Sequence, residues 1–217
     1  MRIPKRLLLL ITLPALAGGL AGAVDASEQA RDGDKTRTAA RAPLAATVLG
    51  EEVHTDDADE MQRIVLSKLF DHYAEQQGID VTDAEIDAFV DRMRRGMRAE
   101  GLSAEDELAP DEAAQAEKMR RDMGRSMIRQ WKLNRELYRQ YGGRVIFQQF
   151  GPEPLDAYRR YLEERQAAGD LVIRVKAFEE PFWRYFTDDS RHSFYAPGGE
   201  AEAFEQPPWE DPDVGAE

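Results

Sequence analysis

Histidine side chains are the first candidates for metal binding or catalysis in this 217-residue chain. The three histidines, His54, His72 and His192, are scattered, and none has a second histidine three or four residues away, as a helical metal site would need. The chain has no cysteine, so no thiolate is present to complete a zinc site. The sequence therefore predicts no metal site.

Motifs that bind phosphate or create a nucleophile are also missing. No glycine-rich loop follows a predicted strand, and Gly142 and Gly143 come after a predicted helix, where glycine ends the helix. The sequence contains no G-x-S-x-G pattern. Its 42 acidic residues are too numerous for any one pair to indicate a catalytic site, because most carboxylates lie on the solvated surface. We therefore predict no catalytic residue and no cofactor.

Apolar side chains suited to peptide binding are more prominent. Five methionines recur on the core-facing sides of two neighbouring predicted helices: Met93, Met97, Met119, Met123 and Met127. Thioether side chains are flexible and polarizable, so they adapt to irregular partners, including varied peptides. The simpler interpretation, which the periodicity favours, is that the methionines fill the core between the two helices.

A dense aromatic group lies near the C-terminus and includes Phe182 and Trp183. It predicts a final helix that docks on the domain, or a partner site if the group is exposed. The methionine and aromatic groups together define where we expect a polypeptide client or partner to bind. The candidate binding residues are Met119, Met123, Met127, Trp131, Phe182 and Trp183.

Amphipathic helices are predicted to position these side chains. Apolar residues recur every three or four positions over most of the chain, as in helices that bury one face. The predicted fold class is therefore mainly α, a small helical domain with a short N-terminal strand or arm and a docked C-terminal helix. Residues 144–150 are ambiguous between helix and strand. Helices are predicted over residues 55–78, 82–101, 111–141, 154–168 and 178–186, and strands over residues 47–53 and 171–175.

Local signals define several helix ends. Thr55 is predicted as the N-cap of the first helix. Thr82 and Glu85 form a capping box at the second helix, in which each side chain bonds to the backbone N–H of the other residue. Gly124 lies in the middle of the third helix at a cost of about 1 kcal/mol relative to Ala. Its presence predicts a close helix crossing at that position.

The N-terminus has the features of a signal peptide over residues 1–23. Three basic residues precede an apolar run, and the small residues Ala21 and Ala23 fit a signal peptidase site. The apolar run is shorter than the ~20 residues that a membrane-spanning helix needs. Export to the periplasm is therefore predicted, and the alternative is retention as an inner-membrane anchor through residues 7–23.

The rest of the chain divides into three predicted segments. Residues 24–46 lack apolar periodicity and residues 196–217 combine prolines with acidic residues, so both are predicted to be disordered. Residues 47–195 are predicted to form one helical domain. Cleavage after residue 23 removes three basic residues and no acidic one, and changes the net charge from −13 to −16. This charge disfavours nucleic acid as a partner, and disfavours membrane contact beyond the signal peptide.

The order of the elements and one turn motif resemble a known family. The extended segment Val48–Val53 precedes a helix that ends in Tyr73–Ile79, and the turn Asp80–Asp87, a methionine-rich loop and a long helix follow. This order, over residues 47–165, is similar to the N-terminal chaperone module of the SurA-type and PrsA-type exported peptidyl-prolyl isomerases. The resemblance implies a SurA N-terminal-like helical fold that binds unfolded polypeptides.

The chain departs from that family where the catalytic domain would begin. In the family, a parvulin domain follows the helix that corresponds to Pro154–Ala168, but only residues 169–217 remain here. Neither paired histidines nor a Gly-Gly-x-Leu-Gly stretch matches the parvulin motif, so no catalytic residue is carried over. The resemblance therefore implies the chaperone part without the isomerase, with residues 169–195 supplying the C-terminal helix.

These observations predict a non-enzymatic, exported chaperone-like protein. It would bind unfolded or extended apolar polypeptide segments, with outer-membrane proteins among its clients. Two alternatives stay open. One is a divergent peptidyl-prolyl cis-trans isomerase, and the other is an accessory or assembly subunit of one specific periplasmic partner.

Overall fold

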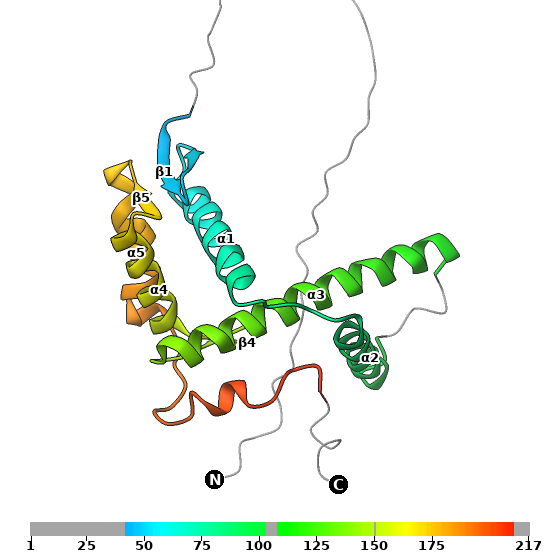
Figure 1. Ribbon diagram of the computed structural model, residues 1–217. Coiled ribbons are helices and arrows are strands. Elements are labelled where there is room, and N and C mark those ends of the chain that lie inside the picture. The colour runs from blue at the N-terminus through cyan, green and yellow to red at the C-terminus, as the bar shows by residue number, and fades with distance from the viewer. Residues whose placement is uncertain (1–41, 103–107, 150, 211–217) are drawn as a thin grey trace, which may run out of the picture. The chain divides into compact units, whose positions relative to one another are not determined.

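The computed structural model describes residues 42–102, 108–149 and 151–210 (Figure 1). These residues belong to one compact unit and are mainly α-helical, which confirms the predicted fold class. The predicted signal peptide, residues 24–41 of the predicted leader and residues 211–217 of the predicted tail lie outside the described residues. The helices are α1 (Ala58–Gln76), α2 (Asp83–Ala99), α3 (Pro110–Tyr141), α4 (Leu155–Ala168) and α5 (Glu179–Thr187). The strands are β1 (Leu44–Val48), β2 (Glu51–His54), β3 (Ile146–Gln148), β4 (Gly151–Glu153) and β5 (Leu171–Ile173).

Helix α1 begins at a different cap from the one predicted. Asp57, not Thr55, is the N-cap, and its side chain accepts a hydrogen bond from the Glu60 backbone N–H at 2.8 Å. Thr55 is buried in the preceding turn, where its hydroxyl accepts from the Asp57 N–H at 3.1 Å and donates to the Glu60 carboxylate. Both residue types cap helices well. The burial of Thr55 in the tertiary structure decides between them.

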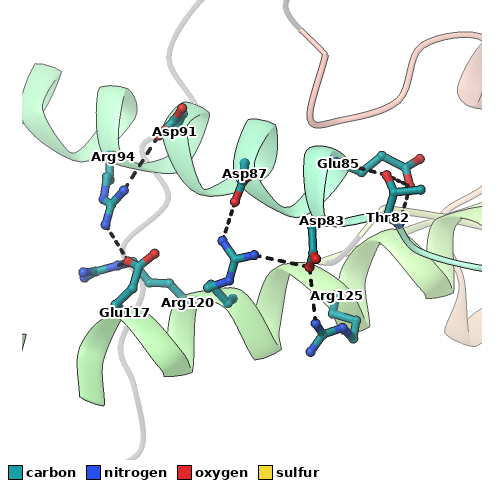
Figure 2. A network of polar contacts seen from close by, with 10 residues as sticks. Thr82, Asp83, Glu85, Asp87, Asp91, Arg94, Glu117, Arg120 and Arg125 are labelled. Carbon is teal, nitrogen blue, oxygen red and sulfur yellow. Dashed lines mark hydrogen bonds and ion pairs between the residues drawn. The ribbon is translucent and has the colours of Figure 1, made fainter. Parts of the chain in front are cut away.

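Helix α2 begins with the predicted capping box (Figure 2). The Thr82 hydroxyl accepts from the Glu85 N–H at 3.3 Å, and the Glu85 carboxylate accepts from the Thr82 N–H at 2.9 Å. Lys132 of α3 also donates to Glu85, at 2.7 Å, so the cap is tied to the neighbouring helix. Val81 and Ile86, on the two sides of the cap, lie in one apolar cluster, as a hydrophobic staple requires. The predicted start of this helix is therefore confirmed.

Helix α2 packs against α3 at the close crossing that Gly124 predicts. Gly124 is buried, and a Cβ atom at this position would lie 2.9 Å from Cδ1 of Phe89 in α2. A larger residue would push the two helices apart, because protein interiors have little free space. Arg94 of α2 and Glu117 of α3 form an ion pair across the same interface (Figure 2). The predicted crossing is confirmed.

Helix α3 is the longest described element, with 32 residues. It contacts α2 from Glu117 to Lys132, and its C-terminal half also contacts α4 and β4, so it links the parts of the fold. Charged residues recur along its whole length. None of the described helices combines the length and the apolar character that a membrane span needs.

A three-stranded antiparallel sheet has the order β2–β1–β5. Strand β1 is central, and its residues Ala45 and Ala46 are fully buried. The folded domain therefore begins before residue 47, the start expected from the sequence. The difference arises because two alanines give no apolar pattern of their own, although pairing with strands on both sides buries them.

The ambiguous residues 144–150 include strand β3, which forms an antiparallel hairpin with β4. On its other side β3 is bonded to a later segment, since the Phe147 N–H donates to the Ser193 carbonyl at 2.8 Å. At the outer edge of β4, Pro152 has no N–H, and its carbonyl accepts a hydrogen bond from Asn134 of α3 at 2.8 Å. This edge is therefore closed to pairing with a further strand.

Two apolar clusters form the core of the described residues. The larger cluster joins β1, α1, α4 and α5 with the second half of α3, and Leu69 and Phe182 are fully buried in it. The smaller cluster lies between α2 and α3 and includes Ile86 and Trp131. The fold is thus stabilised in two places, and α3 contributes to both.

Residues 196–210 differ from the expected disordered tail, because they belong to the smaller cluster. Phe204 and Trp209 are each only 5% exposed. The Trp209 ring packs edge-on against Trp131 of α3, with the ring centroids 5.2 Å apart. The segment has no apolar periodicity, but two aromatic side chains bury enough area to dock it.

Candidate functional site

An open cleft of about 710 Å³ lies between α1, α3, the β3–β4 hairpin and Tyr185 of α5, and we name it the central cleft. Its volume falls in the range of ligand-binding sites. Leu66 and Phe70 of α1 and Leu133 of α3 supply its apolar surface. Amide and hydroxyl groups supply much of its polar surface and come from Gln130, Asn134, Gln148, Gln149, Tyr158 and Tyr185.

A buried hydrogen-bond network forms the inner wall of the cleft. Asn134 donates to the Pro152 carbonyl at 2.8 Å, and its side-chain oxygen accepts from the Tyr158 hydroxyl. Gln130 donates to that same oxygen at 2.8 Å and to the Tyr158 hydroxyl oxygen at 2.7 Å. Burial raises the pKa of the Tyr158 hydroxyl well above its ordinary value, so it stays protonated as a donor. Because its polar groups are mutually bonded, this wall is held in one arrangement.

A partly buried carboxyl, that of Glu153, forms a second polar wall. It accepts a hydrogen bond from the Tyr185 hydroxyl at 2.8 Å, and Gln148 donates to the Tyr185 oxygen at 2.8 Å. Burial raises the pKa of the Glu153 carboxyl, and the Tyr185 hydrogen bond and the charge of His192 only partly offset this effect. Burial and the adjacent Glu153 likewise raise the pKa of Tyr185. The pair therefore offers hydrogen-bonding groups with a reduced tendency to ionise.

An ion pair lies on the lining of the cleft between α1 and α3. Arg129 of α3 and Asp71 of α1 are joined at 2.7 Å, and both side chains remain substantially exposed. An exposed pair of this kind contributes little to stability, on the order of 0–1 kcal/mol. Because the two opposite charges are paired with each other, they add no net charge to the cleft. Apolar and amide groups therefore determine most of the character of its lining. Such a surface can bind a ligand that combines apolar groups with amides.

The three candidate methionines of α3 lie away from the central cleft. Met119 is 63% exposed and Met123 is 42% exposed, whereas Met127 is partly buried. The expectation that all three face the core is incorrect for Met119 and Met123. Gly124 and Ile128 occupy the side of α3 that faces α2, and each residue advances the helix by about 100°, which turns Met123 away from that side.

The three aromatic candidates belong to the two cores. Trp131 is 3% exposed in the smaller cluster, and Phe182 is fully buried in the larger one. Trp183 is partly buried and packs against the larger cluster. The structure therefore does not bring the six candidate residues into one groove, and Trp131 and Phe182 contribute to packing.

Sequence reasoning missed the polar residues of the cleft, among them Asn134, Tyr158 and Glu153. One signal could have identified Asn134. It lies between Trp131 and Leu137 on the buried stripe of the third helix, and a polar residue on such a stripe needs a hydrogen-bond partner. The partner itself could not be predicted, because it lies on the distant β4.

The described residues contain no group of three or more His, Asp or Glu side chains placed to hold a metal ion. His54 contacts Glu52 and His72 contacts Gln76, each at 2.9 Å, while His192 lies near the cleft beside Tyr185. The histidines thus take part in separate local contacts.

No protein-family model matches the chain, and neither a curated protein nor a solved structure matches it. The resemblance to the SurA-type and PrsA-type chaperone module therefore stays a prediction, which rests on the turn Asp80–Asp87 and on the order of the elements.

Proposed function

We propose that this protein is an exported, non-catalytic chaperone-like protein that binds extended polypeptide segments in the central cleft. The observation that carries the proposal is the surface of the cleft, where the apolar side chains of Leu66 and Phe70 share one lining with the amides of Gln148 and Gln149. An extended polypeptide presents both apolar side chains and backbone amides. It can therefore use both kinds of surface at once.

The edge of the β3–β4 hairpin restricts how such a segment binds. A peptide that adds a strand to a sheet needs free backbone donors and acceptors on the edge strand. Pro152 supplies no donor, and Asn134 already occupies its carbonyl. Binding would therefore depend on contacts with the side chains that line the cleft and not on the addition of a strand.

The sequence supports two parts of this proposal, the periplasmic location and binding without a nucleotide. Residues 1–23 have the pattern of an export signal, so the protein would act in the periplasm. The chain has no phosphate-binding loop, and the proposed binding requires no nucleotide. The resemblance to SurA-type proteins supports unfolded outer-membrane proteins as clients.

A tryptophan placed in the cleft tests the proposal. Ser67 is exposed on α1 and lines the cleft, so Ser67→Trp should obstruct it without disturbing the core. Purified protein should suppress aggregation of a denatured outer-membrane protein without ATP, and Ser67→Trp should weaken client binding about tenfold, or ~1.4 kcal/mol. Ala88→Trp, at an exposed position of α2 outside the cleft, is the matched control and should act like the wild type.

Other results would favour the competing functions. If Ser67→Trp is fully active and Met119→Gln with Met123→Gln is not, clients bind the exposed methionines instead. Uncatalysed Xaa-Pro isomerisation takes tens to hundreds of seconds, so acceleration by the protein would be easily measured and would indicate an isomerase. Failure to suppress aggregation, together with binding of one folded periplasmic protein, would indicate an accessory subunit.

A further inference from the structure

Residues 196–210, which we name the C-terminal strap, lie across the smaller cluster with little regular structure of their own. A short turn at Glu202–Phe204 is their one helical element. Their backbone-to-backbone hydrogen bonds are local, such as those from the Phe204 N–H to the Ala201 carbonyl and from the Glu210 N–H to the Pro207 carbonyl. The strap is therefore held to the rest of the protein mainly by side chains.

Two aromatic side chains anchor the strap. Phe204 stacks on Tyr138 of α3 with the ring centroids 5.2 Å apart, and Trp209 packs edge-on against Trp131. Aromatic pairs of this geometry add to the stability gained from burial of their area. Ile86, with the other apolar residues of the smaller cluster, completes the surface beneath them. We name this surface the α2–α3 groove.

The charge of the strap is opposite to that of the C-terminal half of helix α2. The strap contains four glutamates and no basic residue, whereas residues 92–98 of α2 contain four arginines and no acidic residue. Arg92 donates to the Glu210 carbonyl where the strap reaches α2. Complementary charge of this kind accelerates the encounter of a segment with its groove and selects against segments of the wrong sign.

We propose that the α2–α3 groove is a peptide-binding site that the strap occupies in cis. The partner that binds the α2–α3 groove in place of the strap is an extended, acidic polypeptide segment with two aromatic side chains spaced like Phe204 and Trp209. The strap has the properties of such a ligand, since it is irregular, proline-containing, acidic and anchored by two rings. This groove is separate from the central cleft, so the inference does not depend on the proposed function.

Occupancy by the strap lowers the apparent affinity for a partner. The apparent dissociation constant equals the intrinsic value divided by the fraction of molecules with an open groove. A groove open in about one molecule in ten therefore binds its partner about tenfold more weakly than a groove that is always open. Weakening the strap should raise the affinity for a partner by the corresponding factor.

A peptide-binding experiment tests this relation in the purified protein. Phe204→Ala with Trp209→Ala loosens the strap, and Phe178→Ala, which removes a partly buried aromatic side chain packed on the larger cluster, is the control outside the groove. The first probe is a fluorescent peptide of residues 196–210. The second is an acidic peptide that shares only the two aromatic residues and their spacing, and a third peptide has serine in their place.

Fluorescence anisotropy should show that the double variant binds both aromatic peptides at least about tenfold more tightly than the wild type and Phe178→Ala do. The serine peptide should not bind. Hydrogen exchange provides a second measurement, in which α2 of the double variant loses protection and regains it when either aromatic peptide is added. Binding with restored protection supports the proposal even if the double variant is less stable.

Three results would overturn the proposal. In the first, α2 stays protected in the double variant but neither aromatic peptide binds, so the groove is not a peptide site. In the second, α2 unfolds and neither peptide restores it, so Phe204 and Trp209 are ordinary core residues. In the third, only the peptide of residues 196–210 binds and the wild type forms concentration-dependent dimers, so the groove accepts the strap of a second copy.

Discussion

Glu153 and Asp156 lie close together in the chain, but their carboxyl groups have opposite electrostatic environments. Burial alone would raise the pKa of Asp156, but the hydrogen bonds and the charge of Arg144 outweigh it and hold this pKa below its ordinary value. Arg144 donates to both Asp156 oxygens, each at 3.0 Å. At Glu153 burial is the dominant influence, and the pKa is raised. Asp156 therefore stabilises the fold as a carboxylate, whereas Glu153 is better tolerated when it is protonated.

The pH dependence of stability should reveal this difference. A carboxyl with a raised folded-state pKa contributes its full stability below its unfolded pKa, here 4.5, and loses that contribution as pH rises through the folded-state pKa. Glu153→Gln stays neutral and can still accept from Tyr185. Urea unfolding should find this variant more stable than the wild type at pH 7, with the difference disappearing below about pH 4.5.

Asp156→Asn provides the control of opposite sign. Asp156→Asn should cost about 2 kcal/mol near neutral pH, because the charged hydrogen bonds from Arg144 to Asp156 are weakened while Arg144 keeps Asp189 as a partner. The contribution of a carboxyl with a lowered pKa is present above its unfolded pKa and is lost as pH falls through the folded-state pKa. The difference from the wild type should therefore shrink in acid.

Parallel pH profiles for Glu153→Gln and the wild type would show that the environment of Glu153 does not affect stability.

Helix α2 shows how far local chemistry defines an element. The Thr82–Glu85 capping box joins residues three positions apart, and therefore forms as the sequence predicts. Tertiary contacts then add to it, since Lys132 of α3 donates both to Glu85 and to the Asp80 carbonyl. The start of α2 is thus specified twice, by its own residues and by its neighbour.

Removal of the Thr82 hydroxyl measures the local contribution. Thr82→Ala should lower the free energy of unfolding by about 1 kcal/mol, because the Glu85 N–H loses its capping partner. Thr82→Ser keeps the hydroxyl and should retain most of the stability. Chemical denaturation of the three proteins checks this expectation, and equal losses in both variants would attribute the effect to the Thr82 methyl group.

At the scale of the whole molecule, the described residues have two cores of different size that share α3. The larger core unites β1, α1, α4 and α5, whereas α2 is stabilised chiefly by α3 and by the C-terminal strap. Segments with fewer buried apolar contacts open at lower free energy than the rest of a protein. The two cores should therefore differ in local stability.

Native-state hydrogen exchange tests this difference. Amides of α2 should exchange at lower denaturant concentration than amides of α1 and α4, while the larger core remains protected. Trp131→Ala removes a buried ring from the smaller core and should lower the free energy of unfolding by about 3–5 kcal/mol. The difference in local stability between α2 and the larger core should therefore increase. A single cooperative step in which α1, α2 and α4 lose protection together would show that the two cores act as one.

The sequence by itself determined the features that depend on residues close together in the chain. The mainly α character follows from apolar periodicity, and the start of α2 follows from Thr82 and Glu85. The close crossing at Gly124 was also predictable, because a glycine in a helix interior is unfavourable unless packing requires it. In each case the sequence signal lies within one helix.

Only the tertiary structure decided which side of each element is covered, and by what. Met119 and Met123 lie on the predicted stripe, but α2 packs one position further around α3, which leaves both side chains exposed. Asn134 finds its partner at Pro152 on another element, so the inner wall of the central cleft has no sequence-local signal. Trp209 is buried because α2 and α3 form a surface for it, and a proline-containing acidic segment does not reveal such a distant partner.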